Sequence, residues 1–582
     1  MHVATTRRQH KGVVYETHLL RRSYREDGKV KSQTLANLSY LPAATIQLIK
    51  ESLAGKTHQV AGEDWEIERS LPHGHVAAIW AMANRLKLPA LIGPSCRERD
   101  IVMSLVISRA ARPASKLATT RWWSDTTLAE DFAVQGASTD DVYGAMDWLV
   151  SRQARIEAGL ARRHLSEGSR VLYDLSSSWM EGTECPLAAY GYSRDKKRGK
   201  TQIEYGLLTD PDGRPLSIEV FSGNTADPKA FVSAVNICRE RFGLSELVMV
   251  GDRGMITQAR IQALAELGGP DWITCLRAPQ IRMLMQQGAL QLGLFDEVNL
   301  ATITHPDYPG ERLIACRNPD LAKVRARTRL ELLEATEAEL AKIADSVASK
   351  TLLGKDKIAL RVGKVVNRYK VAKHFILAIE DDAFSFNRDE KAIESEAALD
   401  GIYVIRTSVG EDQMSDTDAV EAYKGLSVVE RDFRNLKAID LDLRPIYHWS
   451  EQRVRAHVFL CMLSAYVTWH LRRAWAPLCF SDDEIPKRDD PVAKALRSKK
   501  AQHKDATKTT EDGEVVHNFQ TLLDHLATLT RNRVAFAKGV TIEKLSLPTS
   551  TQRRAFELIG TPIPTTLGAS RQKNNTDDAR IA

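Results

Sequence analysis

Five short apolar runs decide the fold of this chain: VLYDL (171–175), IEYGLL (203–208), PLSIEVF (215–221), LVMVGD (247–252) and DWITCL (271–276). Runs of this length and apolar character, most of them bounded by turn residues or a helix, predict β-strands. The segment from Asp227 to Phe242, between the third and fourth runs, predicts a helix. The order strand, strand, strand, helix, strand therefore predicts an α/β core built on one sheet.

Two aspartates close strands of this predicted sheet. Asp174 ends the first strand and Asp252 ends the fourth. Ligands of α/β sheets bind at the carboxyl ends of the strands, so the two side chains can converge there. Each aspartate alone is also explained as an ordinary turn or cap residue. A third carboxylate would complete a site of hard oxygen ligands, the kind that Mg²⁺ prefers.

A helix further along the chain supplies that carboxylate. Tyr423, Glu430 and Lys437 follow one another at seven-residue intervals, so they share one stripe of the helix. The buried side of the same helix is expected from Leu426, Val429, Phe433 and Leu436. A solvated face is the alternative explanation. In the functional interpretation Glu430 binds metal, while Tyr423 and Lys437 reach phosphates.

The stretch YKGLSVVERDFRNLK (423–437) resembles the DDE transposases of the insertion-sequence group marked by the pattern Tyr-x2-Arg-x3-Glu-x6-Lys. Leu426 stands where that pattern has Arg, and Arg431 or Arg434 could take its place. The resemblance covers roughly residues 170 to 475. It extends to GYSRDKKRGKTQIEYGLL (191–208), GNTAD (223–227), VGDRGM (250–255) and LRPIYHWSEQRVRAHVFL (443–460).

The resemblance implies a ribonuclease-H-like catalytic core, whose strand order agrees with the one predicted above. It implies that Asp174, Asp252 and Glu430 are catalytic and bind two Mg²⁺ ions, with Mn²⁺ as a possible replacement. The implied reaction is DNA transposition: cleavage of the element ends and joining to target DNA, by cut-and-paste movement. The implied partners are double-stranded DNA, as inverted terminal repeats and target, and a second copy of the chain in a homodimer.

A basic run lies before the second strand, formed by Arg194, Lys196, Lys197, Arg198 and Lys200. Beside a carboxylate cleft such a run suits the DNA backbone, although a solvated loop is the alternative. Together with Tyr423, Arg434 and Lys437 it forms the predicted DNA- and phosphate-binding set. Trp179 could stack on a base, but packing in the core is the more common fate.

The flanking segments complete the predicted organisation. A chain of 582 residues exceeds what one core usually supports, so several domains are expected. They are a basic β-hairpin subdomain at 1–70, turning at Glu26-Asp27-Gly28; a helical DNA-binding or dimerisation region at 71–165; the two halves of the α/β core at 166–276 and 401–480, the second carrying the Glu helix; an insertion at 277–400; and a polar C-terminal region at 481–582, disordered from Thr565.

Composition says little about function, but it indicates the cellular compartment of the protein. The 81 basic and 75 acidic residues permit a polyanion partner without demanding one. Seven scattered cysteines without a CxxC pair indicate reduced thiols and a cytoplasmic protein, associated with the nucleoid when bound to DNA. The apolar stretch Val454 to Trp469 is too short and too charged for a membrane span, so it predicts a buried helix.

Two other functions remain compatible with these residues. One is a nuclease or resolvase on the same fold, which cuts DNA without joining it. The other is a non-catalytic DNA-binding derivative, against which the intact trio of Asp174, Asp252 and Glu430 argues.

Overall fold

The computed structural model describes residues 1–568, apart from 11, 57–64, 183, 226, 267–268, 296–297, 440, 487–489, 494 and 537–539. Most of the tail predicted to be disordered, from residue 569 on, lies outside the described residues. The chain forms two units: unit 1 contains Met1–Leu71 and Thr530–Leu547, and unit 2 contains Pro72–Leu529 and Pro548–Ala582.

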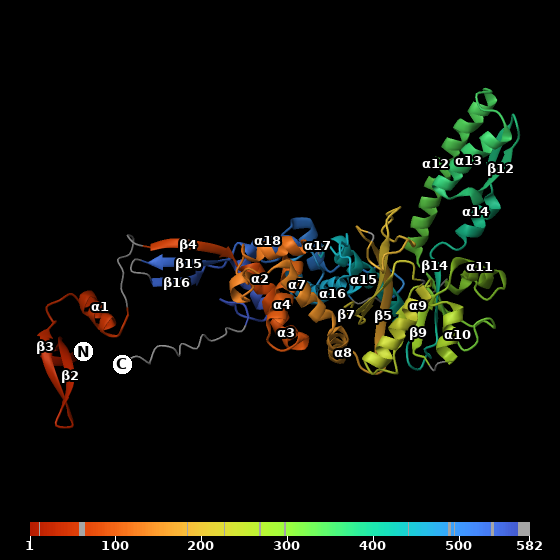
Figure 1. The fold of residues 1–582 in the computed structure, drawn as a ribbon. Helices are drawn as coiled ribbons and strands as arrows, with labels where there is room; N and C mark the ends of the chain where they lie inside the picture. The colour runs from red at the N-terminus through yellow and green to blue at the C-terminus, as the bar shows by residue number, and fades with distance from the viewer. Residues whose placement is uncertain are drawn as a thin grey trace. The chain divides into compact units, whose positions relative to one another are not determined.

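Unit 1 contains two antiparallel sheets and a helix (Figure 1). The elements are β1 (His2–His10), β2 (Val13–Glu26), β3 (Lys29–Asn37), α1 (Ala43–Leu53), β4 (Trp65–Pro72), β15 (Thr530–Phe536) and β16 (Val540–Leu545). Strands β2 and β3 pair across Asp27 and Gly28, whose φ angles of 50° and 75° form the tight turn. The second sheet has the order β16-β15-β4, so it pairs a strand from the N-terminal part of the chain with two strands from the C-terminal part.

A helical block opens unit 2. Its helices are α2 (Gly74–Arg85), α3 (Leu88–Ile92), α4 (Arg97–Ala111), α5 (Lys116–Trp123), α6 (Leu128–Asp131), α7 (Thr139–Val150) and α8 (Gln153–His164). Helix α7 begins at a capping box, in which Ser138 Oγ accepts the Asp141 N–H at 3.1 Å and Asp141 accepts the Ser138 N–H at 2.9 Å. The helical periodicity predicted for this segment is confirmed.

An eight-stranded mixed sheet with the order β10-β11-β14-β9-β8-β5-β6-β7 lies beside this block. Its strands are β5 (Arg170–Trp179), β6 (Gln202–Thr209), β7 (Pro215–Ser222), β8 (Val248–Gly251), β9 (Asp271–Cys275), β10 (Leu300–Ile303), β11 (Arg312–Arg317) and β14 (Ile402–Thr407). Strands β5, β8 and β9 run parallel, whereas the remaining neighbours are antiparallel. The sheet expected from the five apolar runs is present, and it is mixed.

The helices between these strands follow the predicted order. The segment after β7 forms α9 (Asp227–Asn236) and the π-helical turn η1 (Ile237–Arg241), and α10 (Gln258–Glu266) connects β8 to β9. Strands β10 and β11 come from within the segment 277–400, and β11 pairs with β14 along six residues. Part of that segment therefore belongs to the same sheet as the predicted core.

The rest of that segment forms an arm with an apolar core of its own. It contains α12 (Pro319–Ala348), α13 (Lys355–Tyr369), η3 (Ala372–His374), β12 (Phe375–Ile379), β13 (Phe384–Arg388) and α14 (Glu390–Ala397), preceded by α11 (Ala278–Gln286) and η2 (Leu292–Phe295). Leu340, Ile343, Ile358 and Val362 lie in a cluster separate from that of the main sheet. Two long helices therefore cover a two-stranded sheet (Figure 1).

Two helices of the second half pack on the main sheet and helical block. They are α15 (Asp416–Arg434), continued by the π-helical turn η4 (Asn435–Ile439), and α16 (Glu451–Ala474). Gly425 brings α15 close to β5, because a Cβ there would lie 3.3 Å from the Leu172 side chain. Helix α16 is buried along most of its length, as predicted. Among the described residues, no helix combines the length and apolar character needed to cross a bilayer.

Unit 2 ends with η5 (Ala476–Leu478), α17 (Lys499–Thr507), α18 (Phe519–Ala527) and α19 (Ser550–Ile559). Phe519 and Phe556 are buried in the main apolar cluster. The region after 480, expected to be polar, therefore also contributes to the core.

Candidate active site

Strand register places the two aspartates side by side. Strands β5 and β8 run parallel, with Tyr173 opposite Gly251. Asp174 and Asp252 each follow these residues directly, so they lie next to each other across the two strands. Asp174 does not end its strand, as predicted from sequence, because β5 continues to Trp179 along β6. It is β8 that stops, which opens the edge of β5 at Asp174.

The charges of the other two members of the predicted trio act on Asp174. Burial raises the pKa of Asp174 to about 7, the Leu175 N–H and Arg194 lower it, and the charges of Asp252 and Glu430 raise it. The side chain is half-buried and accepts the Leu175 N–H at 2.8 Å. Asp252 and Glu430 are exposed. Two carboxylates and one guanidinium therefore act on Asp174 at this edge.

Glu430 and Tyr423 come from the same helix but meet different surroundings. Val429 and Phe433 are buried on the sheet side of α15, which leaves Glu430 in solvent. Burial raises the pKa of the half-buried Tyr423, and the neighbouring Cys275 and Asp252 raise it further. Tyr423 therefore faces the sheet beside Asp252, not open solvent.

Lys437, the third member of the predicted stripe, lies in a buried ion pair. Its Nζ donates to Asp195 Oδ1 at 2.8 Å, and the Arg444 guanidinium pairs with the same oxygen. The Asp195 side chain is 2% exposed and that of Lys437 is 9% exposed. Burial lowers the pKa of Lys437, whereas Asp195 raises it. In this structure Lys437 holds the loop of Asp195 against η4.

The sequence did not predict the ion pairs of Asp195 with Lys437 and Arg444. Asp195 stands inside the run SRDKKRGK (193–200), which was interpreted by its positive charges alone. The signal available in the sequence was that Asp195 is the one acidic residue in this basic run. Arg444 lies in the LRPIYHW motif (443–449), where no role was assigned to it.

The basic run follows the second half of β5. The Arg194 N–H donates to Ser177 Oγ at 3.0 Å, and the Arg194 charge acts on Asp174. Lys200 forms an ion pair with Glu181 at 2.6 Å. Lys196 and Arg198 are exposed. The run is therefore anchored at both ends and presents cations to solvent between them.

Trp179 lies between two cations of this region. Lys197 Nζ and the Arg444 guanidinium carbon each lie 5.0 Å from the centre of its indole ring. Contacts at this distance are attractive for a cation over an aromatic face. The half-buried Trp179 thus joins the basic run to the loop of Arg444.

Leu426, which stands where the family pattern has Arg, has a packing role in this structure. Leu426 is half-buried and packs against the main apolar cluster. Arg431 and Arg434 are exposed on the same helix. Leu426 therefore serves packing, while both arginines suggested as replacements remain accessible.

His457 has a structural environment. Its Nδ1 accepts from Lys116 Nζ at 3.2 Å and its Nε2 donates to the Leu443 carbonyl at 3.1 Å. Burial holds the pKa of His457 well below its usual value. Both ring nitrogens of His457 therefore have partners within the protein.

The donor set suits a divalent cation, although the side chains are not gathered into a metal cage. Among the residues that the structure describes, no group of three or more His, Cys, Asp or Glu side chains could hold an ion as placed. Asp252 and Glu430 nevertheless raise the pKa of Asp174, a repulsion that a bound cation would relieve. Hard carboxylate oxygens are the ligands that Mg²⁺ selects.

Comparisons with known proteins give two family matches. Residues 3–66 match the IS1634 family transposase N-terminal domain, and residues 177–467 match the transposase DDE domain. The second range includes Asp252 and Glu430 and begins three residues after Asp174. No curated protein matches the sequence. Among solved structures, the chain is similar to a piggyBac transposase in a synaptic complex with hairpin DNA, at 8% identity and a TM-score of 0.35, covering 78% of this chain and 76% of that one.

Proposed function

Because the chain belongs to the DDE transposases of insertion sequences, we propose that it cuts the ends of its element and joins the freed 3′ ends to target DNA. One observation carries the proposal: Asp174 and Asp252 are adjacent in register, and the charges of Asp252 and Glu430 both act on Asp174. The proposal includes a ribonuclease-H-like core, whose strand order β7-β6-β5-β8-β9 supports it.

Asp174, Asp252 and Glu430 would hold two Mg²⁺ ions, or Mn²⁺ in their place. When bound, such ions activate the attacking oxygen and stabilise the leaving oxygen of an in-line displacement at phosphorus. Asp174 has to lose its proton to serve as a ligand, because its pKa lies near 7. Arg194 favours that ionised form, and its guanidinium is well placed to neutralise a phosphate near the trio.

The DNA backbone would lie along the basic run. Arg194, Lys196, Lys197, Arg198 and Lys200 would contact phosphates, and Arg434 would do so from the end of α15. Tyr423 would position Asp252 from the side of β9. Lys437 would act through Asp195, by holding the loop of the basic run in place, and would reach a phosphate directly only after that ion pair opens.

The full reaction needs two element ends, so the proposed working form is a homodimer that moves the element by cut-and-paste. The inverted repeats that flank the coding region would be the substrate. In the test, purified protein is incubated with labelled repeat-end duplexes, a supercoiled target and Mg²⁺ or Mn²⁺. We expect cut ends and joined products, and we expect neither from Asp174→Asn or Glu430→Gln.

The alternatives appear as distinct outcomes of that test. Cutting without joined products under every metal condition would make the protein a nuclease or resolvase and overturn the proposal. Binding without cutting would make it a non-catalytic derivative. Wild-type activity in Asp174→Asn or Glu430→Gln would remove the trio from the site.

A further inference from the structure

Helix α13 of the arm carries a straight row of exposed cations. Lys357, Arg361, Lys364 and Arg368 follow one another at intervals of four, three and four residues, which keeps them on one stripe of an α-helix. All four are exposed. At about 1.5 Å of rise per residue the row is roughly 16 Å long. We refer to these four residues as the α13 row.

The row is separate from the face that holds α13 in the arm. Ile358 and Val362 are buried and Val365 and Tyr369 are half-buried, again at intervals of four, three and four residues. This apolar stripe packs against the arm core, so folding of the arm uses a different side of the helix. The α13 row is not required for packing.

The row also differs from five other bases of the arm, which form ion pairs with carboxylates. Arg327 pairs with Glu331 at 2.8 Å, Lys373 with Glu396 at 2.7 Å and Arg388 with Glu337 at 2.7 Å, and Lys342 and Arg329 also have carboxylate partners. Within the described part of the chain, no ion pair includes Lys357, Arg361 or Lys364. Arg368 acts on the half-buried Glu339 by its charge. The positive charges of Lys357, Arg361 and Lys364 are therefore available to bind a partner outside this chain.

We propose that the α13 row binds the phosphate backbone of duplex DNA, independently of base sequence; this rests on the proposed function only in that DNA is the substrate. A duplex carries one negative charge per about 1.7 Å of axis, so a continuous line of phosphates can match a row of this length. Lysine and arginine without any exposed aromatic between them suit phosphates better than bases.

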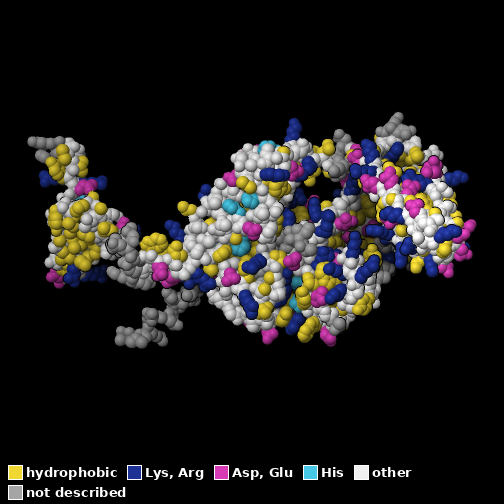
Figure 2. Space-filling view, turned by 90° about the horizontal axis from the view of Figure 1, so that it is seen from above, with side chains coloured by type: hydrophobic (Ala, Val, Ile, Leu, Met, Phe, Trp, Pro, Cys, Tyr) yellow, Lys and Arg dark blue, Asp and Glu magenta, His cyan; other side chains and the backbone are white. Residues whose placement is uncertain are grey.

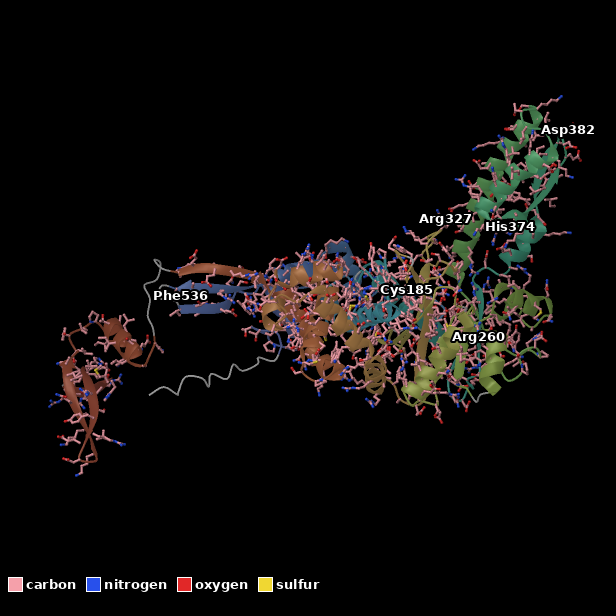
Figure 3. All side chains as sticks on the ribbon, viewed as in Figure 1. Cys185, Arg260, Arg327, His374, Asp382 and Phe536 are labelled. Carbon is pink, nitrogen blue, oxygen red and sulfur yellow. The ribbon has the colours of Figure 1, made fainter. Side chains whose placement is uncertain are left out.

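A second copy of the chain is the rival occupant. The turn between β12 and β13 exposes Glu380, Asp381 and Asp382 (Figure 3 labels Asp382). Three consecutive residues span at most about 10 Å, which is too short to neutralise a row of roughly 16 Å. On the face that Figure 2 shows, acidic and basic side chains are mixed at the end of the molecule that carries the arm.

The test measures the salt dependence of DNA binding by the full-length protein. Fluorescence anisotropy with a random-sequence 30-base-pair duplex is recorded between 50 and 200 mM NaCl without divalent metal. The variant Lys357→Gln/Lys364→Gln is compared with Arg327→Gln/Lys342→Gln, which removes the same charge from exposed and paired positions of α12. Glutamine preserves helix propensity, and circular dichroism verifies that both variants fold.

We expect the slope of log K against log salt to become shallower by about 1.8 in the α13 variant, at about 0.9 for each of two phosphate contacts. Between 50 and 200 mM NaCl this variant would then lose about 12-fold less affinity than the wild type. The α12 control should keep the wild-type slope. If the α13 variant is misfolded, Arg361→Gln/Arg368→Gln tests the same row.

Equal slopes in the wild type and the α13 variant would overturn the inference. An equal decrease of the slope in the α12 control and in the α13 variant would also overturn it, because the change would then reflect net charge alone. Sedimentation without DNA addresses the rival: a dimer lost only in the α13 variant would assign the row to a second copy. Cleavage by Asp174→Asn would refute the proposed function but would leave this binding result unchanged.

Discussion

Asp195→Asn should expose the role of the buried ion pair behind the basic run. The Asp195 carboxylate, 2% exposed, is shared by Lys437 at 2.8 Å and by Arg444. Asparagine preserves the shape but leaves two cations facing each other without a counter-charge. Loss of one partner from a buried ion pair costs about 3 to 5 kcal/mol, and we expect a destabilisation of that order.

The measurement is urea unfolding of the wild type, Asp195→Asn, Lys437→Met and the double variant. Lys437→Met removes one of the two cations, so the double variant should be more stable than the sum of the single effects allows, by about 2 kcal/mol. Strand transfer is assayed at a temperature where every variant is folded. We expect Asp195→Asn to reduce it, because the basic run loses its attachment to η4.

Two results would refute this reasoning. If Asp195→Asn unfolds at the wild-type urea concentration, the ion pair is not formed in solution. If the single effects add within about 0.5 kcal/mol, Asp195 and Lys437 do not interact. Glu181→Gln, which removes the exposed carboxylate paired with Lys200, is the matched control and should change stability by less than about 1 kcal/mol.

Three further predictions concern buried ionisable groups. Since the pKa of Asp174 is raised to about 7, protons compete with Mg²⁺ below that pH; calorimetry should find about tenfold tighter binding at pH 8 than at pH 6, and a pH-independent affinity would contradict the pKa shift. Glu157 is fully buried and pairs with Arg241, so Glu157→Ala should lower the free energy of unfolding by about 3 to 5 kcal/mol, and a change below 1 kcal/mol in urea unfolding would argue against the pair. Burial lowers the pKa of Lys116 to about 7, whereas the unfolded side chain keeps its proton up to about pH 10.5; wild-type stability should therefore rise between pH 7 and 9, and Lys116→Met should lack this rise while the surface variant Lys500→Met retains it.

Local patterns were sufficient to predict much of the fold. The apolar runs predicted β5, β6, β7, β8 and β9, and helical periodicity predicted the block from α2 to α8. These patterns depend on residues within one turn or two strand positions of each other, so they can be identified from neighbours along the chain. The Tyr, Glu and Lys spacing that pointed to α15 is local in the same way.

Pairing between distant segments could not be predicted in this way. Strands β15 and β16 join β4 from the other end of the chain, and β10 and β11 extend the main sheet. Short strands of this kind carry weak signals, and their partners are chosen by burial and backbone hydrogen bonding in the folded unit. The sequence interpretation therefore assigned them to a polar region and an insertion.

The sequence by itself determined which residues are available for chemistry: Asp174, Asp252 and Glu430, and the bases around Asp195. Only the tertiary structure decided how they are used. Register places Asp174 in mid-strand beside Asp252, and an ion pair between residues 242 positions apart buries Lys437 against Asp195. The charge of a side chain is a property of its residue type, whereas its partner, burial and pKa depend on segments that meet only when the chain folds.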